Sequence, residues 1–511
     1  MKQSTFKKTF VLLLLLLFSF SCLISTFPSE PTQTVEAQTE VTNNFLSRNT
    51  VYYENINGKT VAVDSLYRYM GEKLNNPNVA QGIMIKQSID YKKKYPEKEV
   101  YVTLTSFHLS VVASVCLDEE SPNYGRMKSL YDAEYDDEGY YRISYLLVEA
   151  ARYGINVIVI GQIDAGSVLQ ESGYVSDINH TTYFKSHLED DCYEEGKKVK
   201  DYMVAKTTDW TSYGDKPGSD MMHLKSCTVS NYIDSNGVEH GSAVWLSSTN
   251  LDGIDMNECN GLNMIQTGVV ISDHEDLRRV VYNYTKLMSQ YCGQEEINIF
   301  RDKVIKMNTE QTKLINAGKS NQIASDEQIV YLGTENDKVF EMYFSPFGGD
   351  TENWDTEMNP FSKYITKLLP SISGGNHIEI MWNNVKFVSN FAFAKTVEDI
   401  IQYSFANNVN LNNILYLNVG DIDASKFSSF VEGENIGVCS INEFRHYGYH
   451  TKDLQLSYVE DGQRYYISLL NSLNFHAGAM FGQSNSVLVI KESESTGNSF
   501  YSNFKDLTVP I

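Results

Sequence analysis

Two short motifs place a histidine two residues before a lysine: His223-Leu-Lys225 and His450-Thr-Lys452. No other of the ten histidines has this spacing. On an extended strand, positions i and i+2 point to the same side, so each motif is predicted to present an imidazole and an ammonium to one space. An imidazole can act as a nucleophile or a proton donor, and an ammonium can hold an anionic oxygen. A single copy would more often be a solvated strand face.

The surroundings of the two motifs repeat as well. A serine follows each histidine by seven positions, at Ser230 and Ser457, and a Ser-x-Asn follows each motif across a hairpin. These later segments are Ser248-Thr-Asn250 and Ser472-Leu-Asn474. A lone Ser-x-Asn is most simply a turn or a strand end. Its recurrence at matching distance in two halves favours a duplicated catalytic set.

Such a set suits the cleavage of a phosphodiester, whose negative charge repels nucleophiles and whose alkoxide leaves poorly. A neutral imidazole can attack phosphorus and form a phosphohistidine, which splits one hard displacement into two easier ones. A second, protonated imidazole can donate to the leaving oxygen. Two ammonium groups and two asparagine amides can hold the oxygens where charge gathers. With these fixed cations, we expect the chemistry to require no metal and no cofactor.

With these motifs the chain resembles the phospholipase D superfamily, whose signature is HxK, four residues, Asp, and then Gly-Ser-x-Asn. The resemblance extends over most of the chain and implies two phospholipase D-like α/β/α sandwich lobes related by a pseudo-twofold axis, with the active site between them. It implies that His223 is the nucleophile and His450 the general acid, although either order stays open. The segment Phe481–Ile490 is similar to the branch that holds poxvirus envelope phospholipases and lysosomal 5′-exonucleases.

The chain departs from that signature in its supporting residues. Ser230 and Ser457 stand where the family has Asp. The family often has an acidic residue after Ser-x-Asn that orients the catalytic histidine, and alignment on Val269-Val-Ile271 and Leu488-Val-Ile490 puts Gln266 and Asn485 there. An amide can orient an imidazole but stabilises its cation less than a carboxylate does. The departures keep open a catalytically weak phosphate- or lipid-binding homologue.

Each half shows the same order of predicted elements, which argues for an α/β fold. We expect strands at 100–105, 155–160, 378–382 and 414–419, helices at 143–150 and 396–405, and hairpin turns at 234–237 and 460–462. We also expect Ser272 and Glu275 to form a capping box before a helix whose apolar face belongs to the core. The predicted domains are a signal peptide at 1–37, a first lobe at 38–295, a linker at 296–328 and a second lobe at 329–511.

The N-terminal segment predicts export. Lys2, Lys7 and Lys8 precede an apolar run over 11–20 that is too short to span a bilayer comfortably, and cleavage is expected near Ala37. Lipidation at Cys22 is the rival interpretation. After cleavage, six cysteines would remain, and an exported protein permits disulfides among them. We therefore expect a secreted or extracytoplasmic protein.

The formal net charge of -23 disfavours nonspecific binding to nucleic acid or anionic membranes. Together with export, this favours a phospholipid headgroup as the substrate. A nuclease that acts on single-stranded nucleic acid stays open as the alternative. Because one chain carries both motifs, we expect a monomer with no obligate protein partner.

Overall fold

The computed structural model describes residues 52–56, 59–68, 77–162, 180–208, 210, 221–251, 266–335, 338–348, 359–383, 396, 399–400, 402–403, 406–407, 415–418, 452–474, 477–495, 497 and 501–502. His450 and the predicted signal peptide lie outside these residues. Half of the residues of the helix expected at 396–405 are described, and each of them is helical. No helix in the described part of the chain is both long enough and apolar enough to cross a bilayer.

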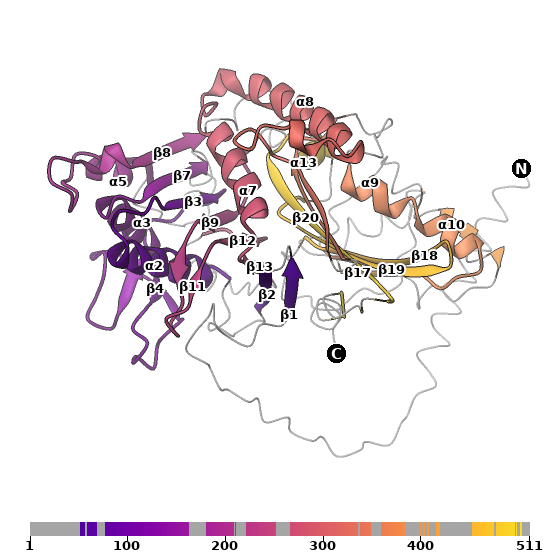
Figure 1. The fold of residues 1–511 in the computed structure, drawn as a ribbon, viewed down its shortest axis with the longest axis horizontal. Coiled ribbons are helices and arrows are strands. Elements are labelled where there is room, and N and C mark those ends of the chain that lie inside the picture. The colour runs from indigo at the N-terminus through magenta and orange to yellow at the C-terminus, as the bar shows by residue number, and fades with distance from the viewer. Residues whose placement is uncertain are drawn as a thin grey trace, which may run out of the picture. The chain divides into compact units, whose positions relative to one another are not determined.

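The first large sheet has eight strands in the order β1-β2-β13-β12-β9-β3-β7-β8 (Figure 1). Its strands are β1 (Tyr52–Ile56), β2 (Lys59–Arg68), β3 (Tyr101–Ser106), β7 (Asn156–Gln162), β8 (Met203–Thr208), β9 (Ser226–Val229), β12 (Ala243–Ser247) and β13 (Gln266–Ser272). Almost every residue of β3 and β7 is buried. Their β-branched and apolar runs therefore suit a central position, where both faces of a sheet are covered.

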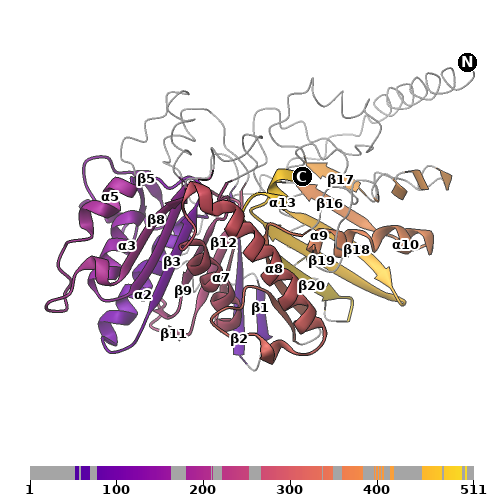
Figure 2. The ribbon, with the colours of Figure 1, turned by 90° about the horizontal axis from the view of Figure 1, so that it is seen from above.

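Helices cover both faces of this sheet. Helices α2 (Val79–Lys94) and α3 (Ile143–Arg152) pack on one face, and α7 (Glu275–Met288) packs on the other (Figure 2). The apolar side chains of α7, predicted to face the core, are all buried: Leu277, Val280, Val281, Tyr284, Leu287 and Met288. Residues 52–495 thus contain an α/β architecture, as the order of elements predicts.

The second large sheet has seven strands in the order β14-β15-β20-β19-β18-β16-β17. They are β14 (Tyr331–Glu335), β15 (Lys338–Ser345), β16 (Glu379–Asn383), β17 (Leu415–Asn418), β18 (Leu454–Glu460), β19 (Gln463–Asn471) and β20 (Asn485–Ser493). The short helices α9 (Pro360–Ile365), α10 (Leu368–Ser373) and α13 (Ala477–Phe481) belong to this half of the chain.

The two sheets repeat one topology. Seven strands of the first sheet, β1-β2-β13-β12-β9-β3-β7, correspond in order to all seven of the second. In both, the last pair is parallel and all others are antiparallel. The register matches too, since Ser247 pairs with Gly268 and Asn471 pairs with Val487. The register therefore makes the positions two residues earlier, Gln266 and Asn485, equivalent first residues of β13 and β20.

The segment predicted to link the halves contains helix α8 (Ile297–Asn316), whose Phe300 and Val304 are buried in a core shared by both sheets. The Tyr284 hydroxyl donates to the Ser345 carbonyl at 2.9 Å and lies 2.8 Å from Ser484 Oγ. These contacts join α7 to the second sheet. The two halves therefore share packing and hydrogen bonds within the described residues.

The remaining elements are small. A three-stranded sheet holds β4 (Ala113–Cys116), β5 (Met127–Ser129) and β6 (Tyr140–Arg142), and a two-stranded one holds β10 (Tyr232–Ile233) and β11 (Glu239–His240). Helix α5 (His180–His187) precedes β8, and short 3₁₀ turns occur at Val199–Asp201, Gln294–Glu296 and Ser320–Gln322. Both predicted hairpins form, the first between β10 and β11 and the second between β18 and β19.

The predicted capping box at α7 is wrong. Ser272 ends β13, and its hydroxyl oxygen accepts a hydrogen bond from Tyr232. The N-cap is His274, whose Nδ1 accepts from the Leu277 amide at 3.3 Å. The strand continues farther than expected because Ser272 still pairs with Ala243. Ser272 therefore belongs to β13 and does not cap the helix, contrary to the prediction from the sequence pattern.

Candidate active site

His223 and Lys225 lie in the extended segment just before β9, rather than within a strand as expected. Both still share one neighbour, the ring of Phe107 that follows β3. The His223 ring lies 5.3 Å from the Phe107 ring centre, and the Lys225 ammonium lies 5.7 Å from it. Lys225 Nζ also donates to the His223 carbonyl at 2.9 Å. The imidazole and the ammonium therefore meet one common side chain, as the i, i+2 spacing predicts.

The second half of the chain holds His223 in place. Its backbone N–H donates to the Ser484 carbonyl at 2.9 Å, and the Ser484 N–H donates to the Met221 carbonyl at 3.0 Å. Its Nδ1 lies 2.7 Å from the Ser472 carbonyl and 3.0 Å from Asn485 Oδ1. Ser472 opens the second Ser-x-Asn, so the first histidine is bound by the second motif set.

The neighbours of Asn485 fix the orientation of its amide. Its Nδ2 donates to the Ala479 carbonyl and to Ser345 Oγ, each at 3.1 Å. A carbonyl can only accept, so Oδ1 is the atom that faces His223. Ser472 Oγ donates to the same Oδ1 at 3.3 Å.

These contacts determine the tautomer of His223. Both oxygens at Nδ1 are acceptors, so Nδ1 carries the proton and the lone pair lies on Nε2. Burial, and then the charges of Lys225 and Lys452, hold the pKa of His223 well below its usual value. The bonds to Asn485 and Ser472 oppose this shift without reversing it. At neutral pH the ring is therefore neutral, with Nε2 available as a nucleophile.

Lys452 brings the second HxK motif to the same place. It is fully buried, and its charge acts on His223. Its carbonyl accepts a hydrogen bond from the Asn471 side chain, and Asn471 ends β19. Its motif partner His450 lies outside the described residues. Lys225 and Lys452 thus supply two buried cations, one from each half.

The two Ser-x-Asn segments follow equivalent strands, β12 and β19. The Oδ1 atoms of Asn250 and Asn474 are both buried and accept no hydrogen bond from the described residues. Each amide oxygen can therefore accept a hydrogen bond from a further donor, whereas only Nδ2–H could donate to an anionic oxygen. Ser248 is buried and lines a cavity of about 10 Å³, large enough for one water molecule, together with Asp453 and Asn471.

The structure places Ser230 and Ser457 away from His223. Ser230 follows the far end of β9, where its Oγ accepts from the Tyr101 N–H at 2.9 Å. Seven residues of extended chain span about 23 Å. Ser457 lies within β18 opposite Glu379, with Arg464 at 3.5 Å from its Oγ. The Gln266 backbone begins β13, and its side chain is outside the described part.

Several residues at the site carried no motif. Phe107 could not be found from the sequence because an aromatic residue after a strand has no distinguishing spacing. The Leu251 N–H donates to Ser106 Oγ at 2.9 Å, and the Ser110 N–H donates to the Leu251 carbonyl at 2.7 Å. These bonds tie the loop of Phe107 to the residue that follows Asn250.

Cysteine thiols and clusters of metal-binding side chains are further groups that can carry chemistry. Burial raises the pKa of the Cys227 thiol, which disfavours a reactive thiolate. Cys116, Cys192, Cys227 and Cys292 are free thiols there, and Cys259 and Cys439 lie outside it. No group of three or more His, Cys, Asp or Glu side chains in the described residues is arranged to hold a metal ion.

The chain was compared with known proteins. No protein-family model and no curated protein matches it. One solved structure with a similar chain path is phosphatidylserine synthase from Haemophilus influenzae Rd KW20. The two are 10% identical with a TM-score of 0.41, and the match covers 83% of this chain and 84% of the other. The function proposed below therefore rests on the geometry around His223.

Proposed function

We propose that this protein is an exported phosphodiesterase of the phospholipase D type that hydrolyses a phospholipid headgroup through a phosphohistidine. The observation that carries the proposal is the state of His223: a neutral imidazole with its Nδ1 proton bound and two buried lysines beside it. A nucleophile of this kind needs a free Nε2, and its anionic target needs fixed cations.

The first step forms a bond between His223 Nε2 and phosphorus and breaks the bond from phosphorus to the leaving oxygen. We propose that His450 gives its proton to that oxygen. The positive charge that develops on the His223 ring is stabilised through Nδ1–H by the Ser472 carbonyl and Asn485. Lys225, Lys452, Asn250 and Asn474 hold the phosphoryl oxygens.

In the second step, His450 takes a proton from water. The water oxygen bonds to phosphorus as the phosphorus–nitrogen bond breaks, which frees His223 and releases a phosphomonoester. We propose that Gln266 orients His450 as Asn485 orients His223, because both residues begin equivalent strands. One chain supplies both motif sets, so a monomer without a metal or cofactor suffices.

The direct test is the release of choline or ethanolamine from phosphatidylcholine and phosphatidylethanolamine vesicles by the exported protein in excess chelator. We expect release that continues with chelator present. Absence of release from both lipids, with digestion of single-stranded DNA from a free 5′ end, would move the assignment to a nuclease. Inactivity on all these substrates would assign the chain to phosphate or lipid binding.

Exchanging the Asn485 amide for a carboxylate should shift the pH profile. A carboxylate 3.0 Å from Nδ1 favours the imidazolium, so Asn485→Asp should raise the pKa of His223. Since the nucleophile must be neutral, the acid limb of kcat/KM should move to higher pH. Asn485→Ala is the comparison variant: it should lower the rate about tenfold without moving that limb upward. An unchanged limb in Asn485→Asp would contradict the role of Asn485.

A further inference from the structure

Four tyrosines between the end of β5 and the first turn of α3 are not fully buried: two of them are exposed and two are half-buried. The tyrosine surface consists of Tyr131, Tyr135, Tyr141 and Tyr145. Tyr131 is 49% exposed and Tyr135 is 56% exposed, among the most exposed large side chains in the described residues. The Tyr135 ring stacks on Tyr141 with centroids 5.8 Å apart, and it lies 5.6 Å from the Tyr145 ring.

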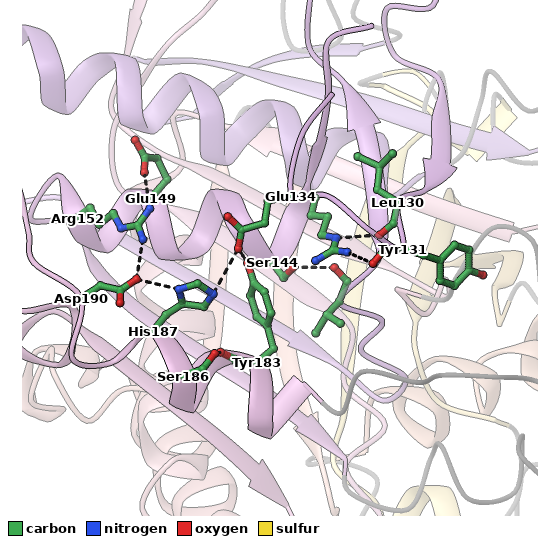
Figure 3. A network of polar contacts seen from close by, with 12 residues as sticks. Leu130, Tyr131, Glu134, Ser144, Glu149, Arg152, Tyr183, Ser186, His187 and Asp190 are labelled. Carbon is green, nitrogen blue, oxygen red and sulfur yellow. Dashed lines mark hydrogen bonds and ion pairs between the residues drawn. The ribbon is translucent and has the colours of Figure 1, made fainter. Parts of the chain in front are cut away.

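Buried polar contacts hold this surface rigidly. Arg142 is 5% exposed, and its guanidinium donates to the carbonyls of Leu130 at 2.8 Å and Tyr131 at 2.7 Å. Figure 3 shows the carbonyls of Leu130 and Tyr131 that accept these two hydrogen bonds, and the Tyr131 ring directed away from them. Tyr135 also forms a β-bridge with Tyr141. Rings already held in an exposed position lose little conformational freedom on binding.

A second set of contacts fixes the loop to α5. The Tyr183 hydroxyl donates to Glu134 Oε1 at 2.8 Å, and His187 Nε2 lies 3.3 Å from the same oxygen (Figure 3). His187 Nδ1 lies 2.8 Å from Asp190, which also binds Arg152. Glu134 precedes Tyr135 directly, so this network positions the most exposed ring of the surface.

The charged residues near these rings favour a positively charged ligand. Lys128 neutralises Asp136 at 2.6 Å and Glu138 at 2.9 Å. Asp132 and Asp137 are exposed and have no ion-pair partner among the described residues. Aromatic faces beside uncompensated carboxylates attract a cation, and best one that is weakly hydrated. The quaternary ammonium of choline fits this description, whereas the chain's net charge of -23 repels anionic lipids.

We propose that the tyrosine surface docks this protein onto membranes that display choline headgroups. The inference rests on the proposed function, because it names the surface on which that site would act. The segment that carries these tyrosines follows Phe107, whose ring lies 5.3 Å from the His223 ring, and runs through β4, β5 and β6 to α3.

The test is cosedimentation of the full exported protein with phosphatidylcholine vesicles. Changing both Tyr131 and Tyr135 to Ala should weaken binding about tenfold, because two exposed cation–π contacts are lost. Arg142 donates to the backbone carbonyl of residue 131, so this hydrogen bond does not depend on the tyrosine side chain and should remain in the variant. The double Phe variant keeps the rings and should bind like wild type. Tyr193→Ala, which removes a tyrosine that is 62% exposed elsewhere, should also leave binding unchanged.

Unchanged binding in the double Ala variant would overturn the proposal, as would equal binding of wild type to phosphatidylglycerol vesicles. A wild-type dimer that becomes monomeric in the double Ala variant would instead assign the surface to a second copy of the chain. Hydrolysis of a soluble short-chain phosphatidylcholine separates this proposal from the proposed function. We expect the double Ala variant to retain that hydrolysis. A wild type that binds vesicles through these tyrosines but never cleaves the soluble lipid would leave the surface intact and remove the phospholipase assignment.

Discussion

Replacing His223 by Gln should lower kcat/KM for an alkyl phosphodiester by at least about four orders of magnitude, because the covalent step has no other nucleophile. Glutamine preserves a hydrogen-bond donor for the buried Ser472 carbonyl and for Asn485 Oδ1. A melting curve near that of wild type would show that the variant folds. Retention of more than a few per cent of wild-type activity would exclude His223 as the nucleophile.

The proposed acid should respond differently to the leaving group. With a p-nitrophenyl phosphodiester, whose leaving oxygen needs no proton, His450→Ala should retain most of the rate of the first step, whereas His223→Gln should remain inactive. With an alkyl leaving group, both variants should fail. The reverse pattern would exchange the two roles, which the motif spacing leaves open.

Replacing Lys452 by Met should lower kcat/KM by about two to three orders of magnitude, because one fixed cation at the phosphoryl oxygens is lost. The same change should raise the pKa of His223, since the charge of Lys452 helps to hold it down. The acid limb of activity should therefore move to higher pH. Both effects are measured together in a pH–rate profile.

Lys491→Met is the matched control for Lys452. Lys491 is a partly buried lysine of the same half, on β20, and its ammonium lies 3.9 Å from the centre of the Tyr465 ring. Burial lowers the pKa of Lys491, so the control also removes a lysine that is partly shielded from water. It should change neither the rate nor the position of the acid limb. Equal losses in both variants would point to a general stability effect and contradict the account.

Hydrogen bonds from the second half of the chain orient the histidine of the first half. His223 of the first half takes its tautomer from Ser472 and Asn485 of the second. In the proposed mechanism the attacking form is a neutral imidazole with its proton on Nδ1, so the first half depends on the second for that form. The shared core around α7 and α8 keeps these partners in register.

The parts of the site that depend on chain order could be predicted from the sequence. Alignment of Val269-Val-Ile271 with Leu488-Val-Ile490 predicts that Gln266 and Asn485 are equivalent, and both residues begin equivalent strands in the structure. The interaction between Asn485 and His223 could be anticipated only as an orientation by an amide. The direction of that amide depends on the Ala479 carbonyl, which belongs to a short helix that no sequence pattern marks.

The parts that depend on packing between distant segments could not be predicted. Phe107 meets His223 because the sheet brings the end of β3 beside the start of β9. Ser230 is equivalent to a family residue by spacing, yet it follows the far end of β9, where its Oγ accepts a hydrogen bond from the Tyr101 N–H. The spacing of residues along a strand determines which face of the sheet each side chain points to. It does not keep a residue near the site, because each further residue adds about 3.3 Å along the strand.

The most direct measurement for the central claim is the mass of the protein after brief reaction with a phosphodiester and quenching at alkaline pH, where a phosphohistidine survives. The account predicts an adduct whose mass equals the phosphoryl portion of the substrate, located on the peptide that contains His223 and absent from His223→Gln. Turnover without any adduct, or an adduct on a peptide that lacks His223, would contradict it.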